Sequence, residues 1–406
     1  MLAPTSEAAL AEAVAQAARD ATPLTILGAG SKAAMLRPVA AEQRLSTAML
    51  DGIVLHAPAE LVLAARAGTR LCRIEEALAA SGQHLIAEPP ALGSLLARAT
   101  GMAPNDAMDD EATLGGTVAA NLSGPRRVAW GAMRDHVIGV RAVNGTGEVI
   151  RSGGRVLKNV TGLDLCKLLA GSHGTLAVMT EITLKVLPAP EASATLILPG
   201  LDPDAAVAAL SAALGSPFGV SGAAWLPDLA GDAGEGPAAL VRIEDFAASV
   251  AYRSEKLAAQ LGVPGTRIVV DAPSRALWRG VRDAEALAVR EGEAIWRVSV
   301  RPSAGPAAYR AIVAAGGHGF LDWGGGLIWV AGPASLALHA AVEQAARQAG
   351  GVWMVLAAPD ALRRQVAVIP PEAPALARLS ARVKAAFDPE AILNPGRMRD
   401  ERAEAA

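Results

Sequence analysis

The stretch "PLTILGAGSKAAMLRPVA", residues 23–40, decides between two ways of folding the first part of the chain. Its apolar start predicts a short strand over residues 24–27, and the following Gly28, Ala29, Gly30, Ser31 and Lys32 predict a loop. A loop this poor in side chains lets backbone N–H groups approach a phosphate. Together with Ala33 it also matches the loose pattern G-x-G-x-x-A. The stretch therefore predicts a phosphate-binding loop.

The residues after this loop argue against a Rossmann unit. Such a unit needs an uninterrupted helix of about ten or more residues, whereas Pro38 would end a helix almost where it begins. Asp51 lies at about the distance of a ribose-binding acid, but "STAMLDGIVLH", residues 46–56, predicts two strands joined by a hairpin-like turn at Asp51-Gly52. Strands and helices mix without regular βαβ alternation, which favours an α+β fold.

Composition narrows the class of protein. The chain has 406 residues, 52% of them hydrophobic and 19% charged, with a net charge of −3. This balance gives no reason to expect nucleic acid or an acidic membrane surface as a partner. The two cysteines, Cys72 and Cys166, are too few for a disulfide scaffold or for an iron–sulfur cluster held by this chain alone. Without a signal peptide or a transmembrane segment in the sequence, we expect a cytoplasmic protein.

The succession of helix-forming and strand-forming segments, with prolines between them, predicts two main parts. Helices are expected over residues 7–19 and 71–80, and β-rich segments over 137–150 and 175–188. The pair Pro188 and Pro190 marks a boundary, after which a helix near 246–261 and short strands over 266–270, 296–300 and 327–330 predict a second α+β domain of a few strands.

Two further glycine-rich segments follow the first loop. They are "ATLGGTVAANLSG", residues 112–124, and "LLAGSHGTLAVMTEITL", residues 168–184. Each glycine could serve only a turn, but three such segments together suit a cofactor with a pyrophosphate, a sugar chain and a flat ring system. The hypothesis from the residues alone is therefore one large phosphate-bearing cofactor.

In order and spacing these segments resemble the FAD-binding domain of the vanillyl-alcohol-oxidase and p-cresol-methylhydroxylase (PCMH) flavoproteins. The resemblance covers nearly all of residues 1–188 and the closing "FDPEAILNPGRM", residues 387–398. More narrowly, "GAGSK" and "RVLKNVTGLDLCKLLAGSHGTL" resemble the FAD-binding subunit of bacterial glycolate oxidase complexes. The resemblance implies a PCMH-type FAD-binding domain of two α/β subdomains over 1–188, an α+β cap domain over 189–380, and a segment over 381–406 that returns to the first domain.

The resemblance also implies which residues border a non-covalently bound FAD. The first loop would wrap the pyrophosphate, the second would lie beside the pyrophosphate and flavin, and the third and the tail would complete the site. The implied cofactor-binding residues are Gly28, Ala29, Gly30, Ser31, Lys32, Thr113, Leu114, Gly115, Gly116, Asn121, Ser123, Gly171, Gly174, Thr175, Ile182 and Asn394.

Several polar residues within these motifs have two interpretations. Lys158 and Arg127 could stabilise the negative charge of a reduced flavin, although ion-pair or surface roles are favoured. His136 and His173 could attach the flavin covalently, but neither meets the attachment motifs. Asp164 is interpreted as a structural residue rather than a cofactor contact.

The second domain lacks the residues that independent catalysis on a 2-hydroxy acid requires. Related catalytic subunits and D-lactate dehydrogenases supply a histidine pair and an acid that hold a metal, whereas this domain has only His318, with Asp322 four residues on, and His339, which is expected to be structural. We therefore expect no metal site and assign no catalytic residue. Arginines could hold a carboxylate, with surface or ion-pair roles as the default; they are Arg242, Arg279, Arg282, Arg297 and Arg301.

Three hypotheses remain open. The chain could be a FAD-containing subunit of a glycolate oxidase complex, beside a catalytic flavoprotein and an iron–sulfur partner, taking part in the oxidation of glycolate to glyoxylate. It could instead be a self-sufficient FAD-dependent dehydrogenase for a small 2-hydroxy acid such as D-lactate, or a flavin-bearing assembly protein without turnover. The three FAD-binding segments are intact, whereas the second domain lacks a set of acid–base and metal-binding residues. This combination favours the first hypothesis.

Overall fold

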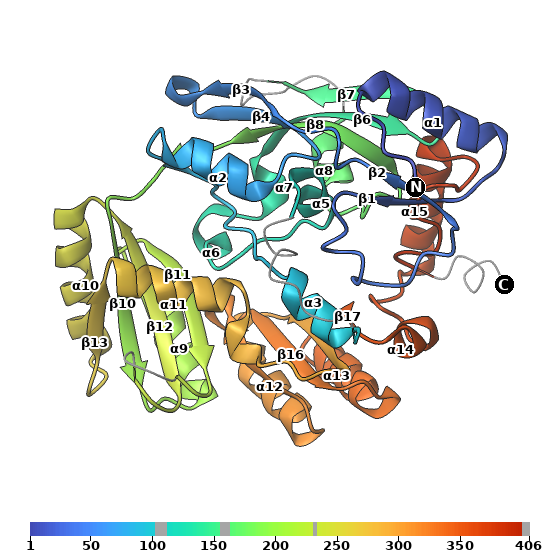
Figure 1. Cartoon of the computed structure of the whole chain (residues 1–406). Coiled ribbons are helices and arrows are strands. Elements are labelled where there is room, and N and C mark those ends of the chain that lie inside the picture. The colour runs from blue at the N-terminus through green and yellow to red at the C-terminus, as the bar shows by residue number, and fades with distance from the viewer. Residues whose placement is uncertain (102–111, 155–162, 230–233, 400–406) are drawn as a thin grey trace.

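The chain folds into two parts, each built on its own sheet. A computed structural model describes residues 1–101, 112–154, 163–229 and 234–399. In Figure 1 the five-stranded sheet of the first part lies above the eight-stranded sheet of the second, with short helices between them. Among the described residues, no helix is long and apolar enough to cross a membrane.

The first part combines a five-stranded antiparallel sheet with a small parallel one. The five-stranded sheet has the order β3-β4-β8-β6-β7, and two small sheets pair β1 with β2 and β5 with β9. The strands are β1 (Leu24–Leu27), β2 (Gln43–Ser46), β3 (Ile53–Ala57), β4 (Val62–Arg66), β5 (Gln83–His84), β6 (Val137–Asn144), β7 (Val149–Gly153), β8 (Ala177–Lys185) and β9 (Leu187–Pro188). The described helices are α1 (Glu7–Arg19), α2 (Leu71–Ala79), α3 (Gly93–Ala99), α5 (Leu114–Ala119), α6 (Arg127–Trp130), α7 (Met133–His136) and α8 (Leu165–Leu169).

The region around the first glycine loop has no Rossmann helix, in agreement with the argument from Pro38. Turns, not a helix, connect β1 to β2. The predicted hairpin at Asp51-Gly52 is wrong, because β2 pairs in parallel with β1 and β3 pairs with β4. Parallel pairing places Leu45 in the same buried cluster as Leu24 and helix α1, which gives β2 more apolar burial than a local hairpin would.

The second part is one eight-stranded antiparallel sheet, larger than the few strands expected from the sequence. Its order is β13-β10-β12-β11-β15-β16-β14-β17. The strands are β10 (Ala192–Pro199), β11 (Val220–Leu226), β12 (Ala238–Asp245), β13 (Arg267–Val270), β14 (Glu293–Ser299), β15 (His318–Asp322), β16 (Leu327–Pro333) and β17 (Val352–Ala357).

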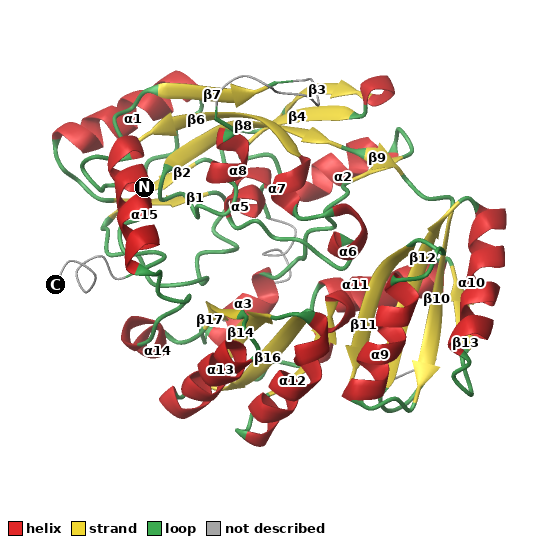
Figure 2. Ribbon diagram, turned by 180° about the vertical axis from the view of Figure 1, so that it is seen from behind, coloured by secondary structure: helices red, strands yellow, loops and turns green. Residues whose placement is uncertain are grey.

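Helices cover the sheet of the second part unequally. Figure 2 shows α9, α12 and α13 along the outer face, with α10 beside α9. Helices α3 and α6 of the first part contact this sheet, so residues of the first part help to cover its inner face. The helices are α9 (Pro203–Leu214), α10 (Ala247–Leu261), α11 (Ala272–Arg282), α12 (Gly305–Ala314), α13 (Leu336–Gln348), α14 (Asp360–Gln365) and α15 (Pro374–Phe387), with short 3₁₀ turns that include η4 (Trp323–Gly325).

The two parts share a core and are joined a second time by the C-terminal segment. Met35, Leu36 and Leu96 of the first part belong to the same buried cluster as the large sheet. Helix α15 spans the expected limit between residues 380 and 381, and its Lys384 Nζ donates to the carbonyl of Thr175 at 2.7 Å. The limits 1–188, 189–380 and 381–406 therefore stay predictions, and the last of them falls inside a helix.

Candidate functional site

The first glycine loop, helix α5, the third glycine segment and the tail converge on one pocket. These segments are far apart in the sequence, and the parallel bridge between Leu24 and Leu393 brings the tail alongside β1. The pocket is lined by Ile26, Leu27, Gly28, Ala29, Gly30, Ser31, Lys32, Ala33, Thr113, Gly116, Ala119, Ala120, His173, Asn394 and Arg397. The structure thus gathers eight of the sixteen predicted cofactor-binding residues around one hollow.

The first loop presents unbonded N–H groups to this pocket. Within the described residues, the backbone N–H groups of Ala29, Gly30 and Ser31 have no hydrogen-bond acceptor. Gly30 has φ +93°, a conformation that favours glycine, and a Cβ built there would meet nothing within 4 Å. Donors in a side-chain-free concavity are what a phosphate anion requires.

Two arginines hold the other side of the loop. Arg397 donates to the carbonyls of Lys32 and Ala33, each at 3.0 Å. Arg363 donates to the carbonyls of Ala34 and Leu36, each at 2.9 Å. Because these hydrogen bonds engage the carbonyl oxygens of the loop, they fix its conformation and leave its N–H groups available to a ligand. The sequence analysis missed Arg397, although it stands within the quoted tail motif.

Helix α5 supplies the opposite wall of small residues. Thr113 caps the helix, its Oγ1 accepting from Gly116 N at 3.4 Å. A Cβ at Gly28 would overlap Thr113 Oγ1, so this glycine allows the loop and the helix to touch. Leu114 and Gly115 lie behind this wall, where Gly115 N donates to the carbonyl of Ala67 at 2.8 Å. The segment therefore divides into residues that line the pocket and residues that anchor the helix.

Asn394 fastens the tail to the pocket through its own side chain. Its Oδ1 accepts from Ile26 N at 2.8 Å, and its Nδ2 donates to the carbonyl of His173 at 2.8 Å. Both polar ends of the side chain are used within the protein, so Asn394 positions three segments of the pocket wall. His173 stays neutral, because burial and then the charge of Arg397 lower its pKa to about 3.

The other predicted site residues lie behind the pocket lining. Asn121 Oδ1 accepts from Arg134 N at 3.0 Å and Ser123 Oγ from Met133 N at 2.8 Å, which fixes the turn before β6. Ile182 is fully buried in the core of the five-stranded sheet. Gly171, Gly174 and Thr175 shape the third segment, which contributes His173 to the lining. These residues support the walls of the site.

The structure assigns roles to two of the polar residues that had two interpretations. Asp164 caps α8 by accepting from Lys167 N at 3.4 Å, in line with its predicted structural role. His136 is buried outside the pocket, and burial lowers its pKa to about 4. Lys158 lies outside the described residues.

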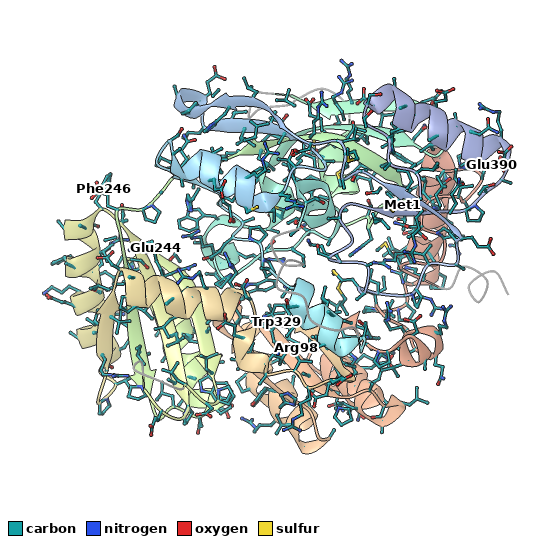
Figure 3. The ribbon with its side chains drawn as sticks, viewed as in Figure 1. Met1, Arg98, Glu244, Phe246, Trp329 and Glu390 are labelled. Carbon is teal, nitrogen blue, oxygen red and sulfur yellow. The ribbon has the colours of Figure 1, made fainter. Side chains whose placement is uncertain are left out.

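A network of four charges, two buried and two partly buried, joins the two parts of the molecule; we call it the seam network (Glu88, Arg126, Arg242 and Glu244). Arg242 on β12 donates to both carboxylate oxygens of Glu88, each at 2.9 Å. Arg126 donates to both oxygens of Glu244 at 2.7 and 3.1 Å. Burial opposes ionisation of Glu244, but Arg242 and Arg126 outweigh it and lower its pKa to about 2. Figure 3 labels Glu244 on the large sheet.

Beside this network lies an arginine–tryptophan cluster (Arg127, Arg297, Trp323 and Trp329). The Arg127 guanidinium carbon is 4.3 Å from the centre of the Trp323 ring, and that of Arg297 is 5.3 Å from the same ring and 4.9 Å from the Trp329 ring. Burial and then the charge of Arg127 lower the pKa of Arg297 to about 10. Figure 3 labels Trp329 on the large sheet.

The default expectation of a surface or ion-pair role holds for Arg127, which is exposed, and is wrong for Arg297. No carboxylate of the described residues lies within ion-pair distance of either guanidinium, and Arg297 is not on the surface. Arg242 does form ion pairs, but buried ones. Arg282 pairs with Asp283 at 2.7 Å, whereas Arg279 and Arg301 are exposed.

The histidines of the second part do not assemble a metal site. His318 and Asp322 stand at opposite ends of β15, about 13 Å apart at about 3.3 Å per residue. His339 Nδ1 accepts from Trp296 Nε1 at 3.3 Å and is buried on α13, in the structural role expected for it. In the part of the chain that the structure describes, no group of three potential metal ligands occurs.

Comparison with known proteins agrees with this geometry. A family model described as "FAD binding domain" matches residues 1–95 and 90–153. The structure of 4-ethylphenol oxidase from Gulosibacter chungangensis, in its isoeugenol complex, superposes with a TM-score of 0.70 at 16% identity, covering 98% of this chain and 89% of its own. The molecule is thus a flavoprotein with a PCMH-type FAD-binding domain and an α+β cap domain, which confirms the predicted fold class and cofactor, FAD.

Sequence similarity narrows the class. Glycolate oxidase subunit GlcE of Escherichia coli (strain K12) is 36% identical over 390 residues, which are 96% of each chain. Glycolate oxidase subunit GlcD of Bacillus subtilis (strain 168) is 44% identical over 85 residues, 21% of this chain and 18% of its own. The chain belongs to the family of glycolate oxidase subunit GlcE.

Proposed function

We propose that this chain is the FAD-binding subunit of a glycolate oxidase or dehydrogenase complex. In that role it takes part in the oxidation of a 2-hydroxy acid, glycolate, to glyoxylate, and electrons pass through its flavin to a partner subunit. The partners we propose are a catalytic flavoprotein and an iron–sulfur subunit, since the relatives are named as subunits of a glycolate oxidase.

The observation that carries this proposal is the pocket between the first glycine loop and helix α5. Its unbonded N–H groups, the wall of Thr113, Gly116 and Ala119, and the Asn394 clamp fit the pyrophosphate of FAD. When bound, FAD supplies the hydride-accepting ring that oxidation of an alcohol requires. The protein's contribution is to hold that cofactor and to fix its distance from the facing sheet.

The residues of the second part fit a reaction that this chain carries out together with a partner subunit, rather than one that it catalyses alone. Oxidation of a hydroxy acid needs a base near the hydroxyl and a cation near the carboxylate. The described second part has two histidines, one hydrogen-bonded to Trp296 and the other to the carbonyl of Leu287 at 3.0 Å. Both histidines are thus engaged within the protein, so we propose that a partner subunit completes the chemistry.

The test is an absorbance spectrum of the purified chain, followed by anaerobic addition of glycolate and then D-lactate. A flavin spectrum that stays oxidised until partner subunits are added supports the proposed role. Bleaching by the chain alone would establish a self-sufficient dehydrogenase instead. A chain that holds no flavin after reconstitution with FAD would overturn the proposal.

A pair of glycine variants tests the pocket itself. Gly30 and Gly82 both have positive φ, +93° and +63°, and a Cβ at either would meet nothing within 4 Å. Gly30→Ala adds backbone strain and a methyl group in the phosphate space, while Gly82→Ala adds strain alone. We expect G30A to lose most of its bound FAD and G82A to keep it. Equal FAD content in the two variants would refute this location of the pyrophosphate.

A further inference from the structure

Two guanidinium groups at the seam lie against the same aromatic ring, and no carboxylate of the described residues is within ion-pair distance of either. Arg127 comes from α6 of the first part and Arg297 from β14 of the second, and both lie against Trp323. Within the described residues, neither guanidinium has a carboxylate or a carbonyl as hydrogen-bond acceptor, and Arg297 Nε is buried without any partner. Among the described residues, the close contacts of both groups are ring faces, while the charges of Asp135 and Asp322 act on Arg127 and Arg297 respectively without forming an ion pair.

Other arginines inside the described structure are treated differently. Arg126 and Arg242 bind carboxylates, and Arg363 and Arg397 bind loop carbonyls. A buried charge is expensive unless it is paired, and two like charges near each other increase the penalty. This penalty falls on Arg297, since Arg127 is exposed, and an anion supplied from outside the protein would offset it.

The position of the cluster fits a ligand site. Arg297, Trp329 and Phe320 lie opposite one another on neighbouring strands and share one face of the large sheet. Trp323 Nε1 donates to the carbonyl of Gly124 at 3.1 Å, which ties the cluster to the segment just before α6, the helix that carries Arg127. Arg127 is exposed and Arg297 is largely buried, so the cluster has an open end and a closed end.

We propose that Arg127 and Arg297 together bind the carboxylate of a small carboxylic acid. The fork of a guanidinium matches a carboxylate with two parallel hydrogen bonds. Because the tryptophan rings cover guanidinium faces, the ligand meets the edges of the guanidinium groups. That the acid is the 2-hydroxy acid of the reaction rests on the proposed function; the anion site itself does not.

The test is calorimetric titration of the full chain, saturated with FAD, in a buffer free of carboxylate and phosphate. The probes are glycolate and its neutral amide, glycolamide. We expect glycolate to bind and glycolamide not to, and Arg297→Gln and Arg127→Gln each to weaken glycolate at least about 10-fold, the loss typical of a charged hydrogen-bond donor. Arg301→Gln is the matched control, because Arg301 is exposed on the same part of the chain.

The outcomes separate this proposal from the proposed function. Glycolate binding that survives in both R297Q and R127Q, or equal binding of glycolamide, overturns the anion site even if the flavin reacts normally. If the chain never holds FAD but binds glycolate in a way that R127Q abolishes, the anion site stands and the proposed function fails. Should R297Q not fold, R127Q at the exposed end decides.

Discussion

Arg126 and Arg127 are neighbours in the sequence, yet the structure gives them opposite surroundings. Arg126 makes a two-point ion pair with Glu244, whereas Arg127 lies on the face of Trp323. The same contrast separates Arg242, bound to Glu88, from Arg297, which lies against ring faces and forms no ion pair with the described residues. One pair of arginines holds the molecule together, and the other is left free for a ligand.

The partnered pair also sets the geometry of the unpartnered one. Arg126 and Glu88 belong to the first part, Arg242 and Glu244 to β12 of the second, so each ion pair crosses the seam. Arg127 directly follows Arg126, and its distance from Arg297 depends on how the two parts are held. A rigid support of this kind is what a ligand site needs.

The sharpest test of this contrast compares Arg126→Gln with Arg127→Gln. Removing Arg126 leaves Glu244 buried with one arginine fewer, and breaking a buried ion pair costs about 3–5 kcal/mol. Removing Arg127 gives up one exposed cation–π contact, worth about 0.5–1 kcal/mol. Urea unfolding without added carboxylates measures both, and equal losses would contradict the division into partnered and unpartnered arginines.

Much of the cofactor-binding pocket could be predicted from the sequence, because the local roles of its residues depend on residue type and on near neighbours in the chain. Glycines at 28 and 30, a threonine cap before Gly115 and an asparagine in the tail have local roles that their residue types indicate. Pro38 excluded the Rossmann helix for an equally local reason. Half of the predicted residues, such as Ser123 and Ile182, lie behind the pocket lining. They were predicted from their position in sequence motifs, and a motif does not show which of its residues line the pocket and which pack behind the lining.

The seam could not be predicted, because its interactions join residues far apart in the chain. Nothing near Arg126 in the sequence indicates that Glu244 is its partner, or that Arg127 has none. The pairing of β2 with β1 was missed for the same reason: the Asp51-Gly52 signal is local, whereas burial of Leu45 beside Leu24 is decided by tertiary packing.

Asp322 gives the second prediction, because it is a carboxylate close to the unpartnered pair without an ion pair of its own. It is 2% exposed, and its Oδ1 accepts from Trp323 N at 2.7 Å. Burial raises its pKa to about 7; Glu88 adds to the rise, while the Trp323 N–H, Arg242 and Arg297 oppose it. The folded protein therefore holds this proton more tightly than the unfolded chain.

That difference fixes the sign of the pH dependence. The contribution of Asp322 to the free energy of unfolding is fully present below its unfolded pKa near 4 and is lost as the pH rises through its folded pKa near 7. The free energy of unfolding should therefore fall by about 2–3 kcal/mol between pH 5 and pH 8. Asp322→Asn, which can still accept from Trp323 N, should remove that loss and be more stable than the natural chain at pH 8. The control is Asp204→Asn, at an exposed ion pair with Arg310, which should leave the pH profile unchanged. Parallel profiles for D322N and the natural chain would contradict the prediction.

The smallest expected effect is the most informative about Arg297. In the absence of a ligand, Arg297→Gln gives up two cation–π contacts of about 0.5–1 kcal/mol each and removes the penalty of burying an unpaired charge. These opposing changes should leave the free energy of unfolding within about 1 kcal/mol of the natural value, far from the loss expected for R126Q. Adding glycolate should then stabilise the natural chain against urea and leave R297Q unchanged, because a ligand stabilises only the state that binds it. A large loss of stability in ligand-free R297Q would mean that Arg297, like Arg126, is a structural residue.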